Sequence, residues 1–148
     1  MSIVTVRNGL FATLVACGPY SATEISTCSF DVLESVAASA LTFFPDGTST
    51  FDPDTYGSRN TRHVHKNWMI GGTLWIRDTG DPSAVLSRIW AGYDDLQTTL
   101  AKDESLGGAV GDNGVAYLKS INNQLDRFRS AGGHVWKTVE WVLVAEEF

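Results

Sequence analysis

The segment from His134 to Phe148, HVWKTVEWVLVAEEF, constrains the fold of this chain more than any other. Side chains alternate between the two faces of a β-strand, and here both faces are apolar. One set comprises Val135, Val139, Trp141 and Leu143, and the other comprises Trp136, Val142 and Val144. The segment therefore predicts a strand in a sheet that is covered on both faces.

The stretch from Arg62 to Arg77 predicts a second strand of the same kind. One face carries Trp68, Ile70, Leu74 and Ile76, and the other carries Met69, Thr73 and Trp75. Gly71 and Gly72 in the middle indicate a bulge or a bend.

Two helices are predicted. Ile3 to Cys17 has apolar residues at spacings of three and four and ends at Gly18 and Pro19. Asp81 can accept hydrogen bonds from the free N–H groups of a first helical turn, and Pro82 fits the position after it. This second helix ends near Lys102, and its apolar stripe contains Val85, Ile89, Tyr93, Leu96 and Leu100, with Leu86 and Trp90 alongside.

The remaining elements complete one α+β domain over residues 1 to 148. Phe30 to Phe44 suits a helix or a strand; we favour a strand over 38 to 44 and leave the preceding residues undecided. Val115 to Arg129 alternates, and a turn at Ser130 to Gly133 joins it to the last strand. The expected order is α-β-β-α-β-β, a mostly antiparallel four-stranded sheet with helices packed on one face.

Two helices can cover only one face of such a sheet, so the other face requires a different cover. Self-association is the economical answer, because closed homo-oligomers are the commonest soluble assemblies and interface cores favour aromatic residues and Met. The candidate subunit-interface residues are Trp136, Val142, Val144, Trp75 and Met69.

Bulk properties exclude several classes. A net charge of −6 disfavours nonspecific nucleic-acid binding, and no segment approaches the ~20 apolar residues of a membrane span. The two cysteines, Cys17 and Cys28, lack metal-binding spacing, which favours reduced thiols. The apolar N-terminal run faintly resembles a signal peptide but has no A-x-A site, so we expect an intracellular chain.

No motif predicts catalysis, a metal or a cofactor. His63 and His65 could share one face of a strand, yet no third ligand accompanies them, which favours a solvated pair. Gly107 to Gly114 lacks the Lys-Ser/Thr of a phosphate loop and connects a helix to a strand, which favours a flexible connection. Adjacent acidic pairs such as Asp94-Asp95 do not share a face, and no nucleophile motif is present.

The layout resembles the tail terminator proteins of long, non-contractile-tailed bacteriophages of the lambda type. The resemblance rests on the helix Ile3 to Cys17, the strand ending in LWIRDTGDP, the helix that starts at Asp81-Pro82, and the hairpin closing on HVWKTVEWVLVAEEF. It covers roughly residues 60 to 148 well and the first sixty weakly, and it does not place Gly18 to Ser39.

The resemblance implies a structural virion protein rather than an enzyme. Members of that family form a hexameric ring that caps the tail tube, terminates tail polymerisation and provides the head–tail joining surface. The implied partners are further copies of the chain, the major tail tube protein and a head–tail connector or stopper. The ring would be assembled in the host cytoplasm and would be part of the virion, at the junction of head and tail. There DNA crosses the pore without specific binding, no membrane is involved, and the acidic balance suits such a pore.

Two loops are candidates for docking to the tail tube or the connector. They are Pro45 to Asn60, with Asp46, Phe51, Asp54, Tyr56 and Arg59, and Ser105 to Gly114, with Asp112 and Asn113. Two alternatives stay open: another head–tail connector ring, either a stopper or a tail completion protein, and a small-ligand α+β enzyme or binding domain using His63 and His65. The mass in solution distinguishes the small-ligand domain, which should be a monomer or dimer, from a hexameric ring.

Overall fold

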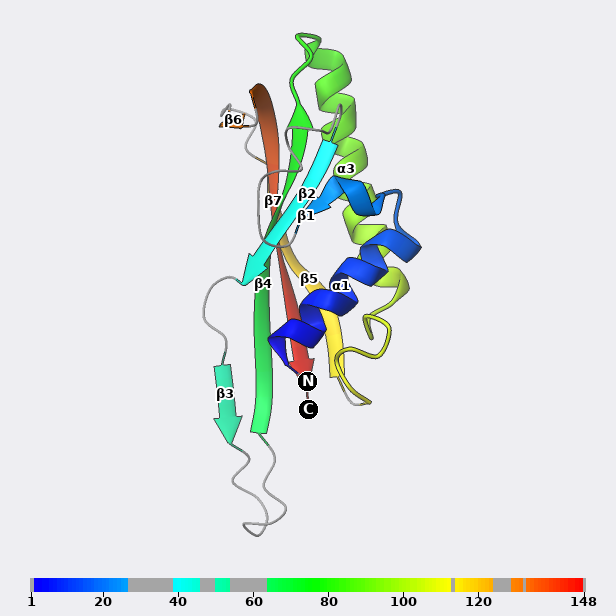
Figure 1. The fold of residues 1–148 in the computed structure, drawn as a ribbon, viewed down its shortest axis with the longest axis vertical. Helices are drawn as coiled ribbons and strands as arrows, with labels where there is room; N and C mark the ends of the chain where they lie inside the picture. The colour runs from blue at the N-terminus through cyan, green and yellow to red at the C-terminus, as the bar shows by residue number, and fades with distance from the viewer. Residues whose placement is uncertain are drawn as a thin grey trace.

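The computed structural model describes residues 2–26, 39–45, 50–53, 64–112, 114–123, 129–131 and 133–147. Two helices, α1 (Ile3–Cys17) and α3 (Pro82–Lys102), lie on one face of an extended antiparallel sheet (Figure 1). The helices and long strands follow one another in the order α-β-β-α-β-β, as the sequence predicts. The α+β fold class is therefore confirmed.

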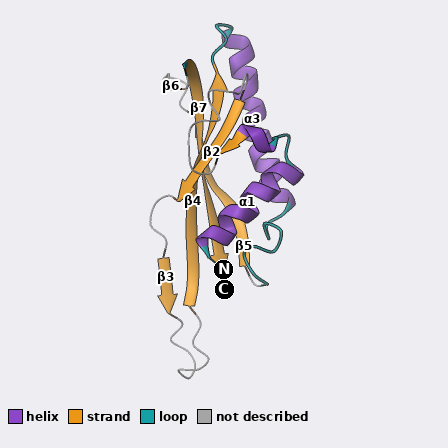
Figure 2. Cartoon of the chain, in the orientation of Figure 1, coloured by secondary structure: helices purple, strands orange, loops and turns teal. Residues whose placement is uncertain are grey.

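Four long strands form the body of the sheet: β2 (Ser39–Pro45), β4 (Val64–Arg77), β5 (Gly114–Asn123) and β7 (His134–Glu147). Their spatial order is β2-β4-β7-β5, with every neighbouring pair antiparallel. Three short strands extend the edges of the sheet (Figure 2): β1 (Ile25–Ser26), β3 (Thr50–Pro53) and β6 (Arg129–Ala131). The sequence does not predict them as strands of their own. Only β1 pairs in parallel among these described strands, with β2.

The two strands with apolar residues on both faces, β4 and β7, lie side by side in the centre of the sheet. Their pairing runs without a shift from Lys66 opposite Glu147 to Arg77 opposite Trp136. The predicted bulge at Gly71 and Gly72 is therefore wrong. The register shift that the structure does contain lies in β5, between Leu118 and Ser120.

Gly72 has a packing role instead of a bulge. A Cβ atom built on Gly72 would overlap the indole of Trp141, the residue opposite it on β7. The indole thus lies directly over the backbone of β4, which only a residue without a side chain permits.

Both helix starts follow from local capping. Asp81 Oδ1 accepts hydrogen bonds from the backbone N–H groups of Ser83, at 3.1 Å, and Ala84, at 3.4 Å, as predicted for α3. The hydroxyl of Ser2 accepts from the N–H of Thr5 at 3.2 Å and caps α1.

The core lies between the helices and one face of the sheet. Its members include Val6, Leu10 and Leu14 of α1, Val85, Ile89, Leu96 and Leu100 of α3, Ile70, Leu74 and Ile76 of β4, and Val139, Trp141 and Leu143 of β7. A Cβ atom on Gly92 would overlap the side chain of Leu74, so α3 approaches β4 closely at this glycine.

The glycine-rich connection after α3, which the sequence predicts to be flexible, contains side-chain hydrogen bonds and buried residues. The carboxylate of Asp103 accepts from the N–H and hydroxyl of Ser105, at 3.0 and 2.5 Å, and from the N–H of Gly107 at 2.7 Å. These hydrogen bonds lower the pKa of Asp103, and the bond from the Ser105 hydroxyl has the largest effect. Leu106 and Val110 of the same loop are buried in the core.

Candidate functional site

The predicted subunit-interface residues alternate with the core residues along β4 and β7, so they occupy the face of the sheet away from the helices. Trp136, Trp75 and Val144 on this outer face are 0%, 5% and 3% exposed in the single chain. Their burial leaves almost no surface for another subunit to cover. These three side chains therefore need no neighbouring subunit to bury them, contrary to the expectation from the sequence, whereas Met69 and Val142 are half-buried and stay interface predictions.

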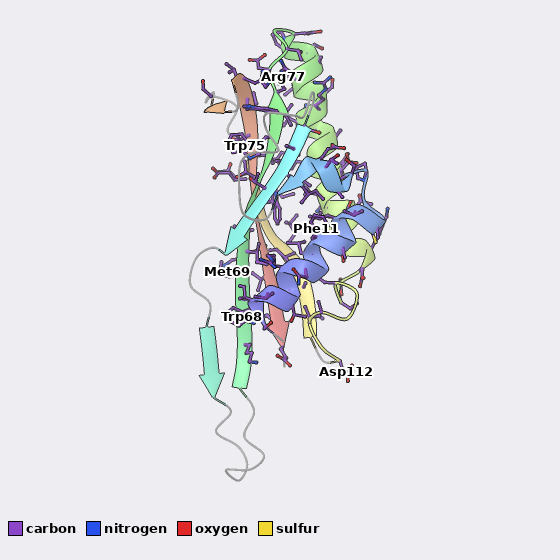
Figure 3. All side chains as sticks on the ribbon, viewed as in Figure 1. Phe11, Trp68, Met69, Trp75, Arg77 and Asp112 are labelled. Atoms are coloured by element: carbon purple, nitrogen blue, oxygen red, sulfur yellow. The ribbon has the colours of Figure 1, made fainter. Side chains whose placement is uncertain are left out.

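Trp75 and Trp136 pack against each other at the end of the outer face where Arg77 lies; Figure 3 labels Trp75 and Arg77. Trp75 and Trp136 meet edge to face, with ring centroids 6.4 Å apart, and His134 meets Trp136 in the same manner at 6.1 Å. The indole N–H of Trp75 donates to the buried hydroxyl of Thr42 at 2.9 Å. The two indoles are buried and the N–H of Trp75 has its hydrogen-bond acceptor, so this end of the outer face is part of the interior of the single chain.

The opposite end of the outer face is more polar and more open. Tyr117, 42% exposed, lies opposite Val144 on β7, and Met69 lies opposite the same residue on β4. Glu146 accepts a hydrogen bond from the side-chain amide of Asn67 at 3.3 Å and another from Tyr117. Partial burial, the charge of Glu146 and this hydrogen bond raise the pKa of Tyr117.

The helical layer also leaves large apolar side chains uncovered. Leu86 and Trp90, which the sequence places alongside the apolar stripe of α3, are 41% and 67% exposed. The core side of α3 is formed by Val85, Ile89, Leu96 and Leu100; Leu86 lies at its border and Trp90 lies outside it. Tryptophan identity alone indicates burial, and only the direction of the helix face shows that Trp90 points outward.

A cavity of about 370 Å³ adjoins this side of α3. Its lining residues are Asp78, Gly80, Pro82, Val85, Leu86, Ile89 and Lys137. The cavity lies where the first turns of α3 face β7, beside Leu86.

The predicted docking loops are placed only in part. Asp112 is exposed, in the loop between α3 and β5, far from Arg77 (Figure 3). Phe51 belongs to β3, of which the backbone alone is described. Asp46, Asp54, Tyr56, Arg59 and Asn113 lie outside the described residues, as does His63, and the side chain of His65 is not described.

The described residues contain no group of three or more His, Cys, Asp or Glu side chains that could hold a metal ion. Within the same ranges no helix has the length and hydrophobicity that a membrane crossing requires. The sequence matches no protein-family model and no curated protein.

Proposed function

We propose that this chain is a structural virion protein that forms a ring on the end of a phage tail tube. The ring terminates tail polymerisation and offers the surface to which the filled head joins. The observation that carries this proposal is the uncovered apolar surface on the helical layer, where the indole of Trp90 is 67% exposed. A side chain of this kind is an anchor for a protein partner, and a ring of identical chains supplies such partners.

The distribution of charge supports a passage for DNA. Glu146 and Glu147 at the end of β7 lie beside the loop that carries Asp103, Glu104 and Asp112, since a Cβ on Gly111 would stand 3.5 Å from a carboxylate oxygen of Glu147. Lys66, opposite Glu147 on β4, offsets only part of this negative charge. With a net charge of −6, a pore lined by this end of the molecule would repel phosphates. DNA would then slide through without adhering.

The test is electron microscopy of phage particles that lack the gene. Termination predicts overlong tails, because nothing stops polymerisation of the tube. Tails of normal length that are separate from filled heads would instead support a connector or stopper ring. Normal tails joined to heads would refute both roles.

A further inference from the structure

Helix α1 is apolar on nearly its whole circumference. Its inward residues Val6, Leu10 and Leu14 are fully buried, yet its outward face also carries Val4, 53% exposed, and Val15, 36% exposed. The other outward positions are small or uncharged: Thr5, Asn8, Ala12 and Ala16. A helix that is hydrophobic all round is normally buried all round, so the outward face of α1 is suited to a protein contact.

The exposed side of α3 has the opposite shape. Leu86 and Trp90 are one helical turn apart and project large apolar side chains from the helix. The small residues of the α1 face leave room for such an indole to pack closely. One chain thus carries both a shallow surface and a projecting one, on different helices.

The borders of the two surfaces carry few charges, and their balance is basic on α1 and acidic on α3. The sole charged residue of α1 is Arg7. The α3 surface is bordered by exposed Asp94, four residues after Trp90, and by Asp78 and Lys137 of the cavity beside Leu86, so acidic groups outnumber the single lysine there. In a chain with a net charge of −6, a contact through these two surfaces brings few like charges together.

We propose that the outward face of α1 in one copy packs against Leu86 and Trp90 of the next copy. The two surfaces differ, so the contact is head to tail, and it yields a closed ring when the rotation between copies closes. This inference rests on the proposed ring and identifies the contact that builds it.

Cysteine cross-linking tests the contact directly. In a chain carrying Cys17→Ser and Cys28→Ser, Ala12→Cys marks α1 and Ser87→Cys marks α3; all the described positions among these are at least partly exposed. A short bis-maleimide should cross-link co-expressed Ala12→Cys and Ser87→Cys chains, and neither chain when expressed alone. Co-expression of Ala12→Cys with Ser120→Cys, an exposed position on β5, is the matched control and should give no cross-linked dimer.

Cross-linking of Ala12→Cys chains alone would show that α1 packs on α1 and would overturn the head-to-tail contact. A ring-sized mass without the Ala12–Ser87 cross-link would also overturn it, and would leave the terminator proposal standing. A monomer at every concentration overturns self-contact through these surfaces, and the tail-length experiment then decides the terminator role separately.

Trp90→Ala supplies an independent readout. Removal of a central interface tryptophan should weaken self-association by roughly 30-fold or more, with Trp90→Phe in between. The melting temperature of the dissociated chain should barely change, because the indole is 67% exposed. Unchanged association in Trp90→Ala would contradict the proposal.

Discussion

The contact between Trp141 and Gly72 predicts a measurable coupling between two substitutions. Trp141 is fully buried, and its indole occupies the space that a Cβ on Gly72 would require. Trp141→Ala should therefore lower the free energy of unfolding by about 3–5 kcal/mol, the usual cost of truncating a core tryptophan. Gly72→Ala in the native background should cost about 1–3 kcal/mol, because the added methyl group overpacks the site.

The two costs should not add. Once the indole is gone, the methyl group of Gly72→Ala enters the vacated space, so its cost should fall to a few tenths of a kcal/mol. Urea unfolding followed by far-UV circular dichroism measures all four chains without relying on tryptophan fluorescence. Trp141→Leu replaces Trp141→Ala if the latter leaves too little stability. Strict additivity would refute the stacking of the indole on Gly72.

Further expectations concern the outer face, the capped loop and the long loop. Trp136→Ala should lower the urea concentration at which the chain unfolds, because the side chain is fully buried. Val142→Asp, at a half-buried position, should reduce the fraction of chains with the mass of the proposed ring more than it lowers the urea midpoint. The reverse ranking of the two variants would refute this assignment of the outer face. Asp103→Asn should destabilise the chain above pH 3.8, the ordinary pKa of the carboxyl; the deficit should shrink as the pH falls through the lower folded-state pKa, which acid titration of both chains measures. Deleting part of Pro45 to Asn60 should leave a ring that no longer terminates tails, and wild-type tail lengths with full infectivity would contradict this expectation.

The elements that the sequence predicts well are those with local causes. Asp81 and Pro82 start α3 through hydrogen bonds within the first helical turn, so a few residues suffice to place it. The alternation of apolar residues in β4 and β7 likewise depends only on the two-residue period of a strand. These signals establish the order of the elements and the fold class.

The incorrect expectations depend on contacts between distant segments. Nothing local distinguishes Gly72 beneath an indole from a glycine in a bulge, because Trp141 lies far along the chain. Composition likewise does not distinguish Trp136, which is buried against Trp75, from Trp90, which is exposed. Tertiary packing determines both cases, and it also determines which candidate interface residues retain free surface.

The long pairing of β4 with β7 has a consequence for how the chain folds. The two strands at the centre of the sheet are separated by α3 and β5 in sequence, so their contacts are strongly non-local. Such pairing requires closure of a long loop before any stabilising contact between β4 and β7 forms, which slows folding. Until β7 is in place, β4 has one unpaired side and an apolar surface without its cover, a state prone to aggregation. Folding rate and solubility during synthesis should thus depend on β7 more than on either helix.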